Sequence, residues 1–125
     1  MKKDHAEHNK SLCDELLAQG KYNDWVVTTA FYSSIHFVDH KIFQPSVTIN
    51  GTVVFDIVQA HRIARQPSKH KTREYLVAQF LSSQIANYRF LADVCWNARY
   101  FNYRISASKA KVARQRLEQI IAACI

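Results

Sequence analysis

Residues 23–43, NDWVVTTAFYSSIHFVDHKIF, form the segment that most limits how this chain can fold. Its large side chains recur at helical spacing on more than one side. They are Trp25, Tyr32, His36 and Phe43 on one face, and Val27, Phe31 and Val38 elsewhere. A helix that is apolar around most of its circumference is normally surrounded by other helices. With Asn23 or Asp24 as N-cap and Pro45 beyond its end, the segment predicts the central helix of a bundle.

Further helices are predicted on both sides of this segment, from capping residues and from apolar residues at helical spacing. They run from Asp4 to Gln19 before Gly20, from Asp56 to Pro67 with a further turn or two capped by Ser68, from Ser82 or Ser83, and from Ser106. The expected buried residues are Leu12, Cys13, Leu16 and Leu17 in the first helix, Ile85, Tyr88, Leu91, Val94 or Cys95, and Ala98 in the helix that starts at Ser82 or Ser83, and Ala110, Ala113, Leu117, Ile120 or Ile121, and Cys124 in the last.

Residues 46–55, SVTINGTVVF, depart from the helical pattern. Two β-branched runs flank Asn50-Gly51, which is the strongest short signal for a hairpin. A lone hairpin is marginal in water, so we expect a small excursion packed on the bundle, or an edge that meets a partner. The chain has only two glycines and two prolines, too few for a turn-rich β fold. The sequence predicts one domain, residues 1–125, that is an all-α up-and-down bundle of four or five helices with a small β-hairpin.

Length and composition exclude several classes of protein. A chain of 125 residues with 48% apolar content is sufficient for one core. No apolar run approaches the roughly 20 residues of a membrane span, and MKKDHAEHNK lacks the apolar stretch of a signal peptide, so we expect a cytoplasmic protein. Cys13, Cys95 and Cys124 are odd in number and far apart, which favours neither a disulfide framework nor a thiolate zinc site. No cofactor is expected.

The net charge of +7 is distributed unevenly. Residues 1–56 carry five Lys and Arg against seven Asp and Glu, whereas residues 57–117 carry twelve Lys and Arg against only Glu74 and Asp93. Such segregation favours an anionic partner, namely RNA, DNA or a nucleotide. The alternative is a solvated basic face that binds no ligand.

Two stretches concentrate candidate groups for an anion or RNA. One contains His61, Arg62, Lys69 and Lys71, with no acidic residue between Asp56 and Glu74. The other interleaves Arg99, Tyr100, Tyr103 and Arg104, followed by Lys109 and Lys111. Mixtures of rings and cations suit single-stranded RNA, because bases stack on rings while cations neutralise phosphates. The alternative is that the tyrosines pack at a helix end with their hydroxyls in water.

The order of the predicted helical segments resembles the order found in a known protein family. KYNDWVVTTAFYSSIHFVDHKIF resembles the second helix of small bacterial HEPN-domain proteins, and SKHKTREYL followed by IANYRFLADVCWNARYFNY matches the order of later elements in one branch. The resemblance covers residues 5–123. It implies an up-and-down bundle that pairs as a homodimer. Many members are metal-independent ribonucleases of stress, toxin-antitoxin or defence systems, while others are non-catalytic modules that bind a cognate protein partner.

The resemblance also implies a catalytic pair, an arginine followed after four to six residues by a histidine near the dimer seam. Arg65 and His70, in RQPSKH, have this spacing. In such chemistry the histidine transfers protons for attack by the ribose 2′-oxygen, and the arginine holds the scissile phosphate. In a continuous helix the two would lie about 140° apart, but Pro67 predicts a break that lets them converge. Two features differ from the family pattern. They are the residue that follows the arginine, Gln66, and the position of the motif in the middle of the chain.

A second pair in the same stretch is His70 and Arg73, which share a helix face at i, i+3. This pair suits gripping a phosphate or an acidic side chain. Catalysis, anion binding and a purely structural corner are therefore three interpretations of residues 65–73.

His36 and His40, with Asp39 between them, have a spacing that metal ligands can use. Because His36 lies in a strongly apolar segment, a buried and hydrogen-bonded histidine is favoured over a ligand. No metal site is predicted.

Overall fold

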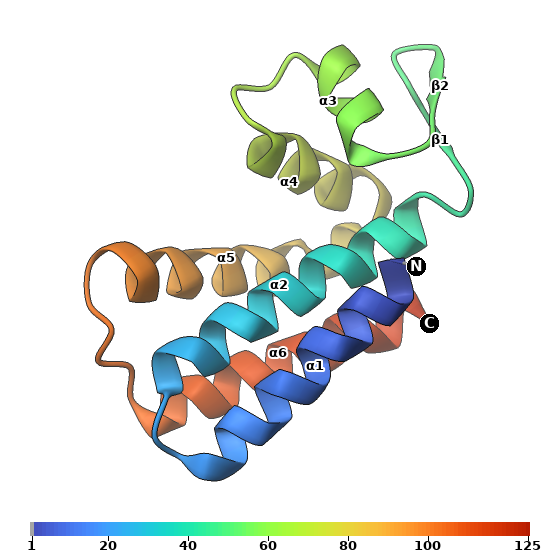
Figure 1. Ribbon diagram of the computed structural model, residues 1–125. Helices are drawn as coiled ribbons and strands as arrows, with labels where there is room; N and C mark the ends of the chain where they lie inside the picture. Colours follow the sequence, from blue (N-terminus) through green and yellow to red (C-terminus); the bar gives the residue numbers. More distant parts are fainter. Residues whose placement is uncertain (1) are drawn as a thin grey trace.

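The chain folds as a helical bundle with one small hairpin (Figure 1), in a computed structural model that describes residues 2–125. The elements are α1 (Lys2–Gln19), α2 (Asn23–Ile42), β1 (Val47–Ile49), β2 (Thr52–Val54), α3 (Ile57–Ala64), α4 (Lys69–Phe80), a 3₁₀ turn η1 (Ser82–Gln84), α5 (Ile85–Tyr100) and α6 (Ala107–Cys124). The predicted all-α bundle with a hairpin is confirmed, with six α-helices in the described residues where four or five were expected.

Helix α2 is the centre of the bundle, as its sequence predicts. It packs against α1, α4, α5 and α6, and thirteen of its twenty residues are buried. Its ends differ from the expectation, because Tyr22 is the N-cap without a side-chain cap bond and the helix ends at Ile42. Trp25, expected on the buried face, is 53% exposed.

The predicted buried stripes are largely confirmed. All the residues expected to be buried in α6 are buried, and in α5 only Ile85 remains half-exposed. The first helix differs, because Leu12 is 40% exposed, whereas Ala6 and Cys13 are fully buried. Helix α1 also begins at Lys2, ahead of the expected cap Asp4.

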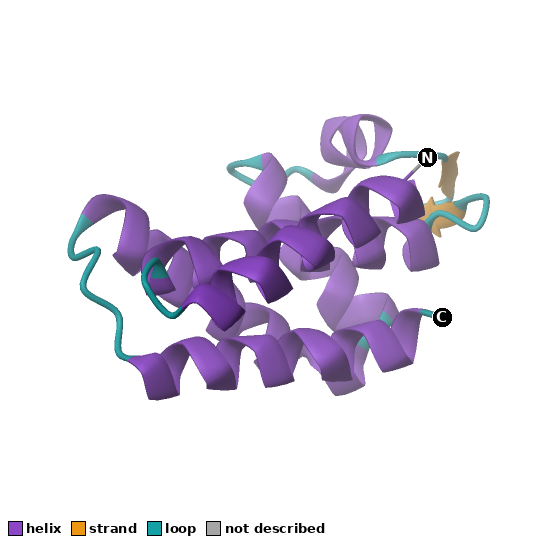
Figure 2. Ribbon diagram, turned by 60° about the horizontal axis from the view of Figure 1, so that its bottom comes forward, coloured by secondary structure: helices purple, strands orange, loops and turns teal. Residues whose placement is uncertain are grey.

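The hairpin forms where Asn50-Gly51 predicts it. Both turn residues have positive φ, 49° and 80°, as a type I′ turn requires. The strands pair antiparallel with Val47 opposite Val54, and Val54 is buried together with Ile49. Figure 2 shows this two-stranded ribbon at one end of the bundle, where it packs on α3. The hairpin is thus the small excursion that was expected.

The break predicted at Pro67 separates α3 from α4. The Asp56 side chain caps α3 by accepting from the Gln59 amide at 2.8 Å, and the helix ends at Arg65 in the left-handed conformation, φ 55°. The Ser68 hydroxyl then caps α4 by accepting from the Lys71 amide at 3.2 Å. The sequence therefore stops one helix and starts another in a new direction.

An ion pair that is almost completely buried fixes α4 to α2. Arg73 Nε and Nη2 donate to the two carboxylate oxygens of Asp39 at 2.9 and 3.0 Å, and both side chains are less than 10% exposed. Burial alone would lower the pKa of Arg73, but the hydrogen bonds and charge of Asp39 outweigh it and raise that pKa. Arg73 thus takes the second of the roles expected for it, gripping an acidic side chain.

Replacing one member of this pair should strongly destabilise the fold. Arg73→Met leaves the Asp39 carboxylate buried and uncompensated, and we expect the free energy of unfolding to fall by about 3–5 kcal/mol in urea denaturation. The double variant Arg73→Met with Asp39→Leu should recover most of this loss, because it removes both buried charges. As a control, Lys71→Met breaks an exposed pair with Glu74 and should cost less than about 1 kcal/mol. Equal losses in the two single variants would contradict this role.

Candidate functional site

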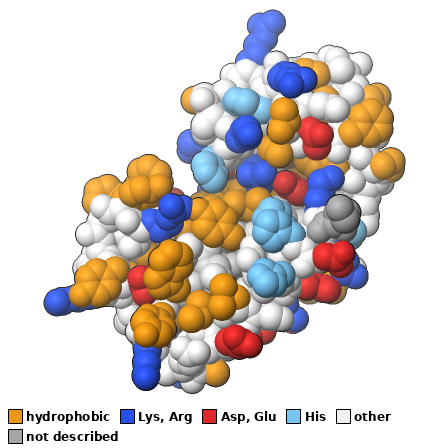
Figure 3. All heavy atoms as spheres, viewed as in Figure 1, with side chains coloured by type: hydrophobic (Ala, Val, Ile, Leu, Met, Phe, Trp, Pro, Cys, Tyr) orange, Lys and Arg blue, Asp and Glu red, His pale blue; other side chains and the backbone are white. Residues whose placement is uncertain are grey.

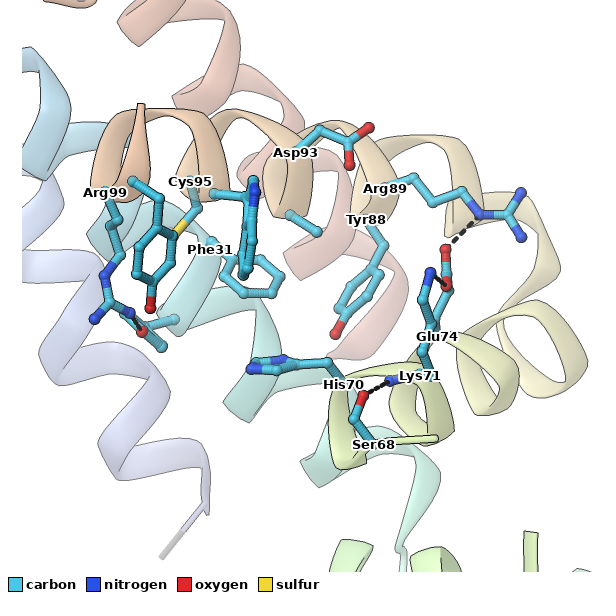
Figure 4. Close-up of a pocket in the computed structure, with 14 residues that line it drawn as sticks. Phe31, Ser68, His70, Lys71, Glu74, Tyr88, Arg89, Asp93, Cys95 and Arg99 are labelled. Carbon is cyan, nitrogen blue, oxygen red and sulfur yellow. Dashed lines mark hydrogen bonds and ion pairs between the residues drawn. The ribbon is translucent and has the colours of Figure 1, made fainter. Parts of the chain in front are cut away.

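A cleft of about 420 Å³ lies between the first turn of α4 and one face of α5 (Figure 4). Its volume is within the range of roughly 300–1,000 Å³ that is usual for small-molecule sites. Three helices contribute its walls. The lining residues are Phe31 and Tyr32 of α2, Ser68, His70, Lys71 and Glu74 at or after the start of α4, and Tyr88, Arg89, Ala92, Asp93, Cys95, Trp96, Arg99 and Tyr100 of α5.

Aromatic rings form much of the cleft. Phe31 is buried, and its ring centroid lies 6.2 Å from that of His70 and 5.6 Å from that of Tyr88. On α5, the rings of Trp96 and Tyr100 lie 4.5 Å apart, and both side chains are more than half exposed. Flat apolar walls of this kind suit a planar ligand.

Arg99 supplies positive charge at one end of the cleft. Its Nη1 donates to the Tyr32 hydroxyl, and its guanidinium carbon lies 5.7 and 5.3 Å from the ring centroids of Tyr32 and Tyr100. No carboxylate pairs with Arg99 within residues 2–125. The cation is therefore held in place but not neutralised by the protein.

At the opposite end of the cleft, one carboxylate lies between two cations. Glu74 accepts from Lys71 Nζ at 3.2 Å and from Arg89 Nε at 2.8 Å. Burial alone would raise the pKa of Glu74, but the bonds and charges of Arg89 and Lys71 outweigh it and lower that pKa. Lys71 and Arg89 therefore share one carboxylate, whereas Arg99 is paired with none among the described residues.

His70 lies in the first turn of α4. Partial burial and the positive charges of Arg73 and Arg99 lower its pKa from the usual value. Its imidazole is therefore neutral at pH 7 and has a nitrogen that can accept a proton. The same turn contains Lys69 and Lys71 and no acidic residue. Cations at a helix N-terminus are unfavourable to the helix by roughly 0.3–1 kcal/mol each, but that end of a helix suits an anion.

The structure does not bring the two residues of the predicted catalytic pair into one cleft. His70 lines the cleft, whereas Arg65 is an exposed residue of the α3–α4 corner and is not among the lining residues. Arg73 and Arg99, rather than Arg65, are the arginines whose charges act on His70, and of these Arg99 lines the cleft. Arg73 does not reach the cleft surface, because its guanidinium is occupied by Asp39.

The other predicted anion-binding residues are spread over several positions. Lys71, Arg99 and Tyr100 line the cleft. His61 lies outside it, with Nδ1 2.8 Å from the Thr72 hydroxyl. Exposed positions outside the cleft are occupied by Arg62, Lys69, Tyr103 and Arg104. The Arg104 guanidinium carbon lies 5.8 Å from the ring centroid of Tyr103.

Residues 57–117 carry twelve Lys and Arg side chains. On the face of the molecule drawn in Figure 3, the Lys and Arg side chains stand apart, separated by apolar side chains and carboxylates. Four of the twelve, Lys71, Arg73, Arg89 and Arg114, are in ion pairs. The reason is that α1, α2 and α4 bring their acidic residues to these cations. Fewer cations are therefore available to an anion than the charge distribution of the sequence suggested.

No group of three or more potential metal ligands occurs within residues 2–125. His36 stacks on His5 with ring centroids 3.8 Å apart, and His40 Nε2 lies 3.1 Å from the Gln44 amide nitrogen. In the same part of the chain, none of the helices has both the length and the apolar character that a membrane crossing needs.

Phe31 and Trp96 were not identified from the sequence as residues of the site, and the position of Tyr88 in the lining of the cleft was not predicted. The available signal was the four-residue spacing of Tyr88, Ala92, Trp96 and Tyr100, which places them along one stripe of α5. Tyr88 was expected only as a core residue, because a period of four does not distinguish a buried stripe from a half-open one.

Comparisons with protein-family models, with curated proteins and with solved structures found no match.

The depressed pKa of His70 can be measured directly. We expect an NMR titration of the imidazole to give a pKa below the usual value of about 6.5, and Arg99→Gln should raise it because a nearby positive charge is removed. Arg104→Gln removes the same charge from outside the cleft and should leave the His70 pKa unchanged. A pKa of His70 that does not respond to Arg99→Gln would show that the two side chains do not share the cleft.

Proposed function

We propose that this protein is a HEPN-type helical bundle that binds RNA or another anionic nucleotide ligand in the cleft between α4 and α5. The observation that carries the proposal is Arg99, a cation held between Tyr32 and Tyr100 without a carboxylate partner in the described chain. An arginine fixed in this way is ready to contact a phosphate, because the protein has already restricted its side chain.

The lining of the cleft supports a nucleotide over a simple anion. Exposed rings of Trp96 and Tyr100 stand beside the cation, and bases stack on such rings while arginine contacts the backbone. The loop after α5 continues this mixture with Tyr103 and Arg104. An RNA strand that leaves the cleft at the loop after α5 would contact further rings and cations.

The HEPN resemblance extends the proposal. It implies a homodimer and a role in a stress, toxin-antitoxin or defence system. A cytoplasmic location is part of the proposal on separate grounds, namely the sequence pattern described above. Exposed Phe101, which is outside the cleft lining, offers apolar surface that a second copy or a cognate protein partner would cover.

Binding through Arg99 should depend on salt in a defined way. We expect labelled single-stranded RNA to bind with an affinity that falls linearly with salt on logarithmic axes, and Arg99→Gln should weaken binding and reduce the slope by roughly 0.7–1. Lys111→Gln removes one charge from the exposed face of α6 and is the charge-matched control. No RNA binding at low salt, together with retention of a copurified protein, would favour the non-catalytic interaction module instead.

His70 favours a second candidate function, metal-independent RNA cleavage. A neutral imidazole beside Arg99 can take the proton from a ribose 2′-hydroxyl while the guanidinium holds the phosphate. The 2′-oxygen then attacks phosphorus, and the bond from phosphorus to the 5′-oxygen breaks as that oxygen takes up a proton from water. The protonated His70 returns its own proton to the solvent. The products are a 2′,3′-cyclic phosphate and a 5′-hydroxyl. In this arrangement Arg99 takes the place that the family pattern gives to Arg65.

The cleavage hypothesis is tested by incubating the protein with labelled RNA in EDTA. We expect 2′,3′-cyclic phosphate ends, complete loss with His70→Ala, and a loss of about a hundredfold or more with Arg99→Gln. Arg65→Gln distinguishes the role of Arg65 from that of Arg99, because the rate of RNA cleavage should remain unchanged in this variant if Arg99 holds the phosphate. Intact RNA after prolonged incubation with the wild-type protein would exclude cleavage and leave binding alone.

A further inference from the structure

The hydroxyl of Tyr88 is a buried polar group whose proton the fold does not use. Tyr88 is 2% exposed, and its hydroxyl proton has no acceptor among residues 2–125, while Arg73 acts on the hydroxyl oxygen through its charge and through hydrogen bonding. Burying a hydroxyl without a partner is costly, and proteins rarely leave one in this state. Tyr88 also lines the cleft, and Figure 4 shows its hydroxyl pointing toward His70.

The surroundings of this hydroxyl make it a hydrogen-bond donor to a ligand. Burial raises the pKa of Tyr88 above its ordinary value, so the phenol keeps its proton. The positive charge of Arg73 acts on the hydroxyl and favours the orientation in which the oxygen faces Arg73 and the proton faces away. The group therefore offers a proton to an acceptor atom in the cleft.

A ligand can reach this proton if His70 moves. The Tyr88 hydroxyl is shielded from water, but His70, toward which it points, is an exposed side chain at the start of a helix. No hydrogen bond between side chains holds the His70 ring within the described residues. Rotation of an exposed side chain is a small change, so a ligand can displace the ring and take its place beside Phe31.

We propose that the cleft takes the base of a nucleotide unit, with a base acceptor atom receiving a hydrogen bond from the Tyr88 hydroxyl while Arg99 contacts the phosphate. The base ring packs among Phe31, Trp96 and the displaced His70. This inference rests on the proposed nucleotide-binding function and adds which part of the nucleotide enters the cleft.

A base fits the inner cleft better than a phosphate does. Beside Tyr88 the lining includes the ring of Phe31, and the nearby cation Arg89 is already paired with Glu74, so a phosphate there would lose its water without gaining a free cation. A base has apolar faces and a neutral polar edge, which match rings and one hydroxyl. The free cation, Arg99, lies on the same helix eleven residues beyond Tyr88, where the backbone of the same nucleotide would lie.

The test compares base-bearing and abasic ligands. Labelled single-stranded RNA decamers of each base and an abasic ribose-phosphate oligomer of equal length are titrated by fluorescence anisotropy. We expect the wild-type protein to prefer a base-bearing oligomer. Tyr88→Phe should weaken that binding by about tenfold and leave the abasic affinity unchanged. The midpoint of urea unfolding of this variant should fall only slightly, because the hydroxyl proton has no acceptor to lose. Tyr75→Phe, on the same helix as His70 but outside the cleft, is the matched control.

A second measurement does not depend on altering Tyr88. The chain has two tryptophans, so Trp25→Phe leaves Trp96 as the only indole, and we expect nucleoside monophosphates to quench its fluorescence. Equal binding of abasic and base-bearing oligomers, unchanged affinity in Tyr88→Phe, or no quenching of Trp96 would each overturn the base site while leaving anion binding intact. Absence of binding to every oligomer would overturn the proposed function as well.

Discussion

The ion pair between Arg73 and Asp39 fixes α4 on α2, and the candidate site depends on that position. Helix α4 buries only four of its twelve residues, Thr72, Arg73, Leu76 and Val77, so apolar packing alone holds it weakly. Arg73 lies one helical turn after His70, and clamping its guanidinium to α2 directs the start of α4 toward Phe31 and α5. A buried charge without its partner is strongly unfavourable, which is why this arrangement has few alternatives.

The same pair sets the electrostatics of the cleft. Because Asp39 occupies Arg73, the latter is not available to a ligand, yet its charge still lowers the pKa of His70. Glu74 is similarly occupied by Lys71 and Arg89. Arg99 is therefore the lining cation left without a carboxylate in the described part of the chain, at the aromatic end of the cleft. The distribution of ion pairs, more than the net charge, determines where an anion would bind.

Local signals in the sequence predicted local structure well. Asn50-Gly51 predicted the hairpin and Ser68 the start of α4, because a turn or a cap depends on a few neighbouring residues. The site was predicted less well, because its geometry depends on contacts distant in sequence. Asp39 and Arg73 are 34 residues apart, and nothing in either segment predicts their pairing. Tyr88 was correctly expected to be buried, but only packing reveals that its hydroxyl proton lacks an acceptor.

The central claim, that a nucleotide ligand binds between α4 and α5, is tested most directly by mapping the binding surface. Backbone amide shifts are followed by heteronuclear NMR during titration with a short single-stranded RNA. We predict that the largest shifts occur in residues 68–74 and 88–100, with smaller ones in the loop that follows α5. Shifts concentrated on α6 or α3, or none at any concentration at low salt, would contradict the account.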